Sequence, residues 1–227
     1  HPVGPGDVAH IAGANRVLTE SFGCGGWDMT LQHMKPVVDW QWALGFNQLC
    51  PHAVFCSIEG FRKTDAPPCP MHNTMWEFYK DLTDYVGRLS YALSQGKPRA
   101  RLALVYPLEQ FQQRFCIGED DDRARVISDT FDHLCVALMR LHYDYEIVPR
   151  WALEQAEVSD GVLRVGDGRR YEAVLWPFAD PQDALWRRVS DAVSCFGIDE
   201  TIGSELARVI DRLGELLYGT FPPAVDV

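Results

Sequence analysis

The chain has 227 residues, of which 47% are hydrophobic and 23% are charged. This composition supports a sizeable core and excludes disordered, collagen-like and low-complexity fibrous proteins. The net charge of −11 excludes the clustered basic face of a nucleic-acid binder and fits poorly with an anionic membrane surface. No apolar run reaches about 18 residues, so no membrane-spanning helix is predicted. Neither nucleic acid nor membrane is therefore an expected partner.

The N-terminus lacks an initiator Met and the basic and apolar segments of a signal peptide. We therefore expect the chain to begin inside a longer polypeptide, whose upstream part could carry a secretion signal. The seven cysteines form no CxxC pair, which argues against a zinc ribbon, and most are expected to be free thiols. Free thiols favour a cytoplasmic location, but the compartment stays open.

The first part of the chain has the pattern of a strand followed by a helix. Residues 16–22 form a short apolar run that ends in polar groups and glycines, which predicts a buried strand leading into a loop. Thr30 can cap the next helix, which ends at Gly45. Pro36 lies beyond the first turn of this helix, where proline is expected to kink or fray it.

A second strand and helix follow in the same order. Residues 46–57 are again apolar, and Thr74 and Glu77 have the spacing of a capping box. The periodic helix after them stops at residues 96–98, which contain Gly and Pro. The alternation across residues 16–96 predicts two strand–helix units with parallel-sheet character.

A second region of alternating strands and helices begins after Pro98. Its apolar segments have the composition of strands that are buried on both faces, which predicts a small open α/β layer with a helical tail. The expected elements are strands at 102–107, 145–149 and 173–177, a hairpin at 162–171, and helices at 127–141, 182–196 and from 202 onward. The turn after the third strand carries no Ser or Cys nucleophile, so this region is not expected to be catalytic.

Glu20 is the first candidate for chemistry. It lies at the carboxyl end of the first predicted strand, where α/β barrels carry their active sites. A carboxylate there suits acid/base or nucleophilic work on a glycosidic bond. The alternative is a carboxylate that caps the glycine-rich loop 23–26 or pairs with a cation.

Polar residues also follow the second predicted strand, at His52, Glu59, Arg62 and Lys63. If the two strands are neighbours in one barrel, these residues share the same mouth as Glu20. The alternative is a loop of solvated charges.

Tryptophans are dense in the first 80 residues. Trp27 lies beside Asp28 in the loop after the first strand, where an aromatic face could stack on a sugar ring. Trp40 and Trp42 fall within the first predicted helix and are expected in the core.

Several motifs lie close together in this part of the chain. The sequence is RVLTESFGCGGWD over residues 16–28, DWQ over 39–41, SIEG over 57–60 and RK over 62–63. Together they resemble glycoside hydrolase family 106, the α-L-rhamnosidase-like enzymes, over roughly residues 8 to 110.

The resemblance implies a (β/α)₈ catalytic barrel, TIM-type, with residues 1–97 as its C-terminal portion, the last two strand–helix units. Residues 98–197 would be a small flavodoxin-like or amidotransferase-like α/β domain with a parallel sheet, similar to the trimerisation domain of β-galactosidase-type enzymes. Residues 198–227 would be a helical tail. A full barrel needs about 250 residues, so this chain alone is expected to lack a complete active site.

The resemblance also assigns roles to individual residues. It implies that Glu20 is a catalytic or substrate-binding carboxylate, with Glu59 or a residue outside this chain as the second carboxylate. The implied sugar-pocket residues are Trp27, Asp28, His52, Arg62 and Lys63. No cofactor is expected, and calcium is implied by the resemblance alone.

Two functions stay open on these grounds. The chain is expected to be part of a glycoside hydrolase that cleaves terminal α-L-rhamnosyl or related residues from polysaccharides or glycosides. The alternative is a non-catalytic carbohydrate-binding or assembly module derived from such an enzyme. Both predict a carbohydrate ligand, and both predict contact with a second copy or with the remainder of a parent chain.

Overall fold

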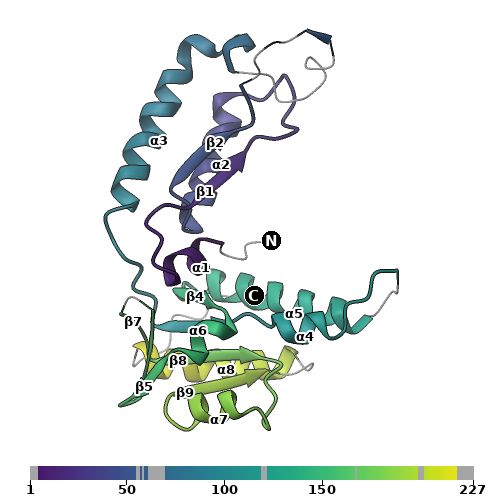
Figure 1. Cartoon of the computed structure of the whole chain (residues 1–227), viewed down its shortest axis with the longest axis vertical. Coiled ribbons are helices and arrows are strands. Elements are labelled where there is room, and N and C mark those ends of the chain that lie inside the picture. Colours follow the sequence, from purple (N-terminus) through teal and green to yellow (C-terminus); the bar gives the residue numbers. More distant parts are fainter. Residues whose placement is uncertain are drawn as a thin grey trace. The chain divides into compact units, whose positions relative to one another are not determined.

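The computed structural model describes residues 5–54, 57, 59–60, 70–118, 122–166, 168–198 and 202–218. The chain divides into two compact units, each a mixed α/β fold with parallel strands (Figure 1). The N-terminal unit is residues 14–97, and the C-terminal unit combines residues 1–13 with 98–227. The domain identities expected from the sequence for 1–97, 98–197 and 198–227 stay predictions.

The N-terminal unit follows the predicted order of strand, helix, strand and helix. Its elements are β1 (Leu18–Ser21), α2 (Leu31–Ala43), β2 (Gln48–Pro51) and α3 (Tyr79–Leu93), with short 3₁₀ helices at Pro70–His72 and Trp76–Phe78. The two strands pair in parallel, with Glu20 opposite Cys50. This confirms the two parallel strand–helix units that the alternating pattern predicts.

The start of α2 agrees with the sequence, whereas the start of α3 does not. The Thr30 hydroxyl accepts a hydrogen bond from the His33 backbone N–H at 3.2 Å and caps α2. The capping box predicted at Thr74 and Glu77 is wrong. A 3₁₀ helix over 76–78 precedes α3, so the α-helix begins only at Tyr79, and Phe78 supplies no side-chain cap.

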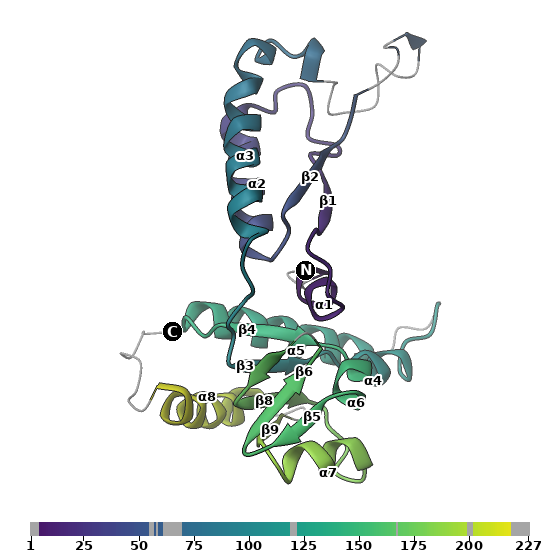
Figure 2. The same ribbon diagram turned by 60° about the vertical axis from the view of Figure 1, so that its left-hand side comes forward.

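Helices α2 and α3 cover one face of the β1–β2 pair (Figure 2). Apolar side chains from both helices and from the strand ends form a single core cluster. Its buried members are Phe22, Met34, Val38, Trp42, Leu82 and Val86. Two polar side chains join this layer, because the Ser21 hydroxyl donates a buried hydrogen bond to Gln41 Oε1 at 2.8 Å.

The Asn47 side chain links the segments that precede β1 and β2 by hydrogen bonds. Its side chain is 2% exposed, accepts from the Val17 backbone N–H at 2.9 Å and donates to the Asn15 carbonyl at 3.0 Å. The side-chain amide therefore pairs two backbone groups that precede β1, where the strand ladder has not yet begun.

The C-terminal unit is built on a four-stranded parallel sheet in the order β4-β3-β8-β9. The strands are β3 (Leu102–Val105), β4 (Tyr145–Val148), β8 (Ala173–Pro177) and β9 (Ser194–Ile198). The helix predicted over 182–196 is wrong at its end, because α7 (Ala184–Ser190) stops before β9. Phe196 and Ile198 are buried two residues apart, which is the period of a strand with one covered face.

Both faces of this sheet are covered. Side chains of α5 (Asp122–Arg140) and α8 (Ile202–Tyr218) pack on one face. The other face packs against α1 (Pro5–Ile11), α6 (Arg150–Glu154), α7, and the antiparallel sheet of β5 (Glu157–Ser159), β6 (Val162–Val165) and β7 (Arg169–Tyr171). The pairing of β6 with β7 confirms the predicted hairpin. The short helix α4 (Leu108–Gln112) follows β3.

A buried polar cluster joins α1 to this sheet. The Arg169 guanidinium and the Tyr171 hydroxyl both donate to the Glu146 carboxylate, which is 2% exposed. Beside them, Asp7 Oδ2 accepts from the Ile147 backbone N–H at 3.0 Å. Burial, with the nearby Glu146 charge adding to it, raises the pKa of Asp7 to about 7.

Replacing Asn47 by Ala is expected to lower the free energy of unfolding of the N-terminal unit by about 2 kcal/mol, because the buried Val17 N–H loses its partner. Urea unfolding followed by tryptophan fluorescence measures the change. The matched control is Asn15→Ala, since Asn15 contributes only its backbone carbonyl, and it should stay within about 0.5 kcal/mol of the unmodified chain. Equal effects of the two substitutions would contradict the assignment.

The raised pKa of Asp7 makes the stability of the C-terminal unit depend on pH. The folded state favours the protonated carboxyl, so its contribution is full below about pH 4 and is lost as pH rises through about 7. From pH 5 to pH 8, the unmodified chain should lose stability relative to Asp7→Asn, by at most about 1.4 kcal/mol per pH unit. Urea unfolding at several pH values measures this, with the exposed Asp144→Asn as control. Parallel pH profiles for the unmodified chain and Asp7→Asn would contradict the prediction.

Candidate functional site

The candidate site is the face of the β1–β2 pair that no described helix covers. Side chains alternate along each strand, so Thr19 and Ser21 are buried while Leu18 and Glu20 are exposed. Leu18 is 53% exposed, although it is paired with Gln48 in the parallel ladder. The register places Gln48 beside Leu18 and Cys50 beside Glu20. These four residues, Leu18, Glu20, Gln48 and Cys50, are called the open face below.

Glu20 and His52 lie at the same edge of this sheet. The strands are parallel, so their carboxyl ends meet, and the His52 backbone N–H donates to the Ser21 carbonyl at 2.8 Å. This bond extends the pairing one residue beyond β2. The structure thus brings together the two strand ends on which the sequence predicts a shared mouth.

The loop after β1 presents Trp27 and Asp28 to solvent. Trp27 is 52% exposed, as a stacking surface for a sugar must be, and Asp28 is exposed beside it. Phe22 and Cys24 both have positive φ, which turns the chain sharply out of β1. Trp42 is in the core as predicted, but Trp40 is 52% exposed, so its predicted burial is wrong. The helical period places Trp40 on the outer side of α2.

The remaining predicted residues contribute less to this geometry. Glu59 is exposed, and its backbone N–H donates to the Ser57 hydroxyl at 3.1 Å. Arg62 and Lys63 lie outside the described residues.

An ion pair that the sequence did not predict lies at the carboxyl edge of the four-stranded sheet in the C-terminal unit. Arg150, after β4, forms a bidentate ion pair with Asp183, which caps α7 by accepting from the Leu185 N–H at 2.8 Å. This pairing holds the pKa of Asp183 below its usual value. Phe178, directly after β8, has φ +55°. The side chain at this sharp turn is a phenyl ring, so the turn supplies no nucleophile.

The described residues show neither a metal site nor a membrane-spanning helix. Among those that the structure describes, no three His, Cys, Asp or Glu side chains come together as a metal site. No helix in the described segments combines the length and apolarity needed to cross a membrane. The described cysteines, Cys24, Cys50, Cys116, Cys135 and Cys195, are free thiols.

Comparisons with known proteins place this geometry in context. No protein family profile matches the chain. It is 27% identical over 182 residues to a protein of Formosa agariphila described as "Putative beta-glucuronidase", a match that covers 76% of this chain and 14% of that protein. Its fold is similar to that of a rhamnosidase from Novosphingobium sp. PP1Y, with a TM-score of 0.56 and 18% identity.

That structural match covers 98% of this chain and 21% of the rhamnosidase chain. The chain therefore spans only 14% and 21% of the lengths of the two proteins that it resembles. Its mixed α/β fold with parallel sheets is similar to a part of that rhamnosidase.

Exposure of the open face can be tested through its cysteine. Cys50 is exposed, whereas burial raises the pKa of the Cys135 thiol to about 11 and that of Cys195 to about 12. At pH 8, a maleimide should modify Cys50 at least tenfold faster than Cys135 and Cys195, as measured by peptide mass spectrometry. Modification of Cys135 at the rate of Cys50 would contradict the described burial.

Proposed function

We propose that the chain is part of a family 106-like glycoside hydrolase that removes terminal α-L-rhamnosyl residues from glycosides or polysaccharides. In this proposal the N-terminal unit supplies two strand–helix units of an eight-stranded barrel. The observation that carries it is the position of Glu20, on the open face and at the carboxyl edge of two parallel strands.

The β1–β2 pair is covered by helices on one face only, and this supports its place in a barrel. Parallel sheets are normally covered on both faces, and a two-stranded sheet is marginal by itself. Here, α2 and α3 cover one face, while Leu18 stays 53% exposed on the other. In a (β/α)₈ barrel the helices cover the outside, and the inward side chains of all eight strands fill the centre. The open face would then be part of the barrel interior.

The groove beside β2 supports the same proposal. A cavity of about 500 Å³ lies along this strand and is lined by residues of β2, such as Leu49 and Pro51, and of α3, such as Leu82 and Val86. A neighbouring strand–helix unit in a barrel would pack against the same residues. Such a unit would also cover Leu49 and Pro51, which are only partly buried here.

Glu20 would act on the glycosidic bond from the barrel mouth. As a carboxylic acid it can protonate the leaving oxygen, and as a carboxylate it can activate water or attack the anomeric carbon. Glycosidases generally use two such groups. Glu59 is one candidate for the second, and a residue on a strand outside this chain is the other. Trp27 would stack on the sugar, and Asp28 and His52 would bind its hydroxyls. Arg62 and Lys63 complete the proposed pocket.

A second candidate function is a non-catalytic carbohydrate-binding or assembly module. The exposure of Leu18 and Trp27 favours it, because such a module would use the same surface to bind a partner or a sugar without turnover. The two functions differ in the expected effect of removing the Glu20 carboxylate, since binding alone does not need a proton donor or a nucleophile.

In the complete parent polypeptide, Glu20→Gln should lower kcat for an aryl α-L-rhamnoside by about 10²- to 10⁴-fold, because the amide keeps the shape but cannot exchange a proton or attack. Steady-state hydrolysis measures this. Glu77→Gln is the matched control, since Glu77 is exposed at the far end of the loop that leads to α3, and it should change kcat by less than twofold. Full activity of Glu20→Gln would overturn the assignment. Hydrolysis by the 227-residue chain alone would overturn the view that its site is incomplete.

A further inference from the structure

The C-terminal unit contains a cavity that the proposed catalytic site does not use. It has a volume of about 360 Å³ and lies at the carboxyl end of β3, between α4 and α5. Strand β3 is flanked by β4 on one side and β8 on the other, so the chain order reverses here. Open parallel sheets bind their ligands at such reversal points. Its position in the fold therefore makes this cavity a candidate ligand site.

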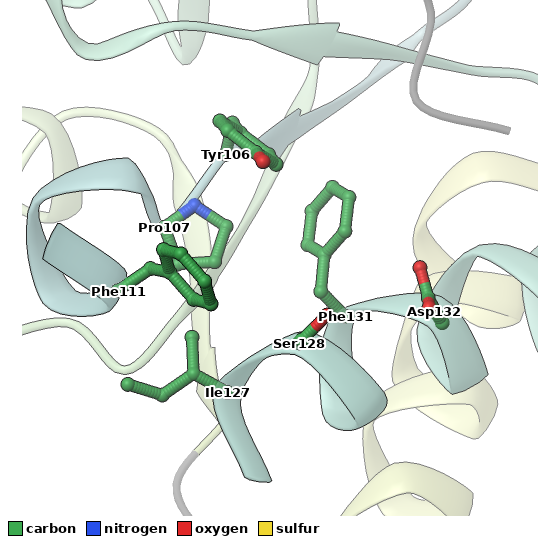
Figure 3. Close-up of a pocket in the computed structure, with 7 residues that line it drawn as sticks. All are labelled: Tyr106, Pro107, Phe111, Ile127, Ser128, Phe131 and Asp132. Atoms are coloured by element: carbon green, nitrogen blue, oxygen red, sulfur yellow. The ribbon is translucent and has the colours of Figure 1, made fainter. Parts of the chain in front are cut away.

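Apolar side chains, most of them rings, form the cavity wall (Figure 3). Phe111 of α4 and Phe131 of α5 lie on opposite sides of the space. Tyr106 and Pro107 close the end nearest β3, and Ile127 of α5 lies at another side. A ligand that fills this space meets carbon on most sides, so it must itself be largely apolar. A charged group would lose its hydration here without compensation, so the ligand must also be neutral.

Contacts with other rings hold the rings of the wall in place before any ligand binds. Tyr106 packs edge-on against Phe131, with their ring centroids 5.1 Å apart, and Phe131 is 2% exposed. Phe115, outside the lining, stacks on Phe111 with centroids 5.3 Å apart and ring planes 16° from parallel. Aromatic rings attract a further ring, edge-on or offset, beyond the effect of the area that it buries. A flat aromatic ligand therefore gains more from this wall than a saturated ligand of the same size.

Two hydroxyl groups of the lining are available to a ligand. Tyr106 and Ser128 are half-buried, and neither hydroxyl forms a hydrogen bond with another residue that the structure describes. Each can therefore donate a hydrogen bond to a polar group of the ligand or accept one from it. The Asp132 carboxyl also lines the cavity, but it already has an interaction within the chain, so no group of the ligand is assigned to it.

We propose that this cavity binds a neutral phenol, which is a flat aromatic ring system that carries a hydroxyl group. The ring system matches the aromatic wall, and its hydroxyl matches the hydroxyls of Tyr106 and Ser128. An apolar protein cavity of roughly 150 Å³ holds benzene, so about 360 Å³ is enough for two fused rings. The inference rests on the C-terminal unit alone and does not depend on the proposed function.

The test is titration of the 227-residue chain with 2-naphthol at pH 7, followed by ligand-observed NMR. Decahydro-2-naphthol is the matched control ligand, because it has the same carbon skeleton and hydroxyl but no aromatic ring. We expect saturable binding of 2-naphthol and at least threefold weaker binding of decahydro-2-naphthol, since the attraction between rings is lost. Methyl α-L-rhamnopyranoside, which carries several hydroxyls around a saturated ring, should not displace 2-naphthol.

Variants of the chain locate the binding. Ser128→Phe fills the cavity without removing any core side chain and should abolish 2-naphthol binding. Ser128→Ala removes only a hydroxyl and should weaken binding about fivefold, which keeps the test decisive if the larger side chain destabilises α5. Ser190→Ala is the matched control on α7, outside the lining, and it should leave the affinity within twofold. Ile117→Ser tests the surface beside α4, because Ile117 is 90% exposed and outside the lining, and it should also leave binding unchanged.

Three results would overturn the proposal. They are absence of saturable 2-naphthol binding, equal affinity for decahydro-2-naphthol, and binding that either Ser128 variant leaves unchanged. Loss of binding in Ile117→Ser would place the ligand on the exposed surface beside α4 and would also overturn it. Because no hydrolysis is measured, failure of this site leaves the catalytic proposal for Glu20 to its own test.

Discussion

The N-terminal unit depends on one constraint, which is that a parallel pair of strands needs cover on both faces. Its helices follow the strands on one side only, because each strand–helix connection returns the chain to the same face of β1 and β2. The core cluster around Val38 and Trp42 satisfies that face. Leu18 and Glu20 stay on the other face, where an apolar and a carboxylate side chain alternate with buried Thr19 and Ser21. The same alternation that builds the core therefore places the candidate carboxylate.

The C-terminal unit shows what complete cover looks like in the same chain. Its four parallel strands have helices on one side and helices with a small sheet on the other, and β3 is buried along its whole length. Even the Glu146 carboxylate of this sheet is buried, and Arg169 and Tyr171 donate hydrogen bonds to it. Within its described residues, a cavity of about 360 Å³ lies where β3 ends and the chain order reverses. One sheet of this chain is therefore covered on both faces, whereas the β1–β2 pair is covered on one. The chain's composition alone does not explain the open face.

Periodicity in the sequence was sufficient to predict most of this architecture. The alternating strands and helices, the Thr30 cap and the hairpin all depend on local patterns, and all were found. The errors arose where tertiary contacts decide. The sequence pattern predicts a helix at β9, because the five residues of this strand carry no local sign of their pairing with β8. Trp40 was predicted in the core because an apolar residue in a helix was assumed to face inward. The proximity of Glu20 and His52 follows from the sequence, because both residues lie at the carboxyl ends of strands predicted to be parallel. The cavity beside Phe131 forms where α4 and α5 meet, and the sequence pattern does not predict α4.

The central claim is that the open face is buried by further strands in a longer polypeptide. The most direct measurement is the maleimide reaction rate of a cysteine at position 18, introduced as Leu18→Cys in a Cys50→Ser background. The rate is compared between the 227-residue chain and the parent polypeptide under the same conditions. The account predicts rapid modification in the isolated chain and at least 100-fold slower modification in the parent, because position 18 would lie inside a closed barrel. Equal rates in the two proteins would show that nothing covers this face and would contradict the account.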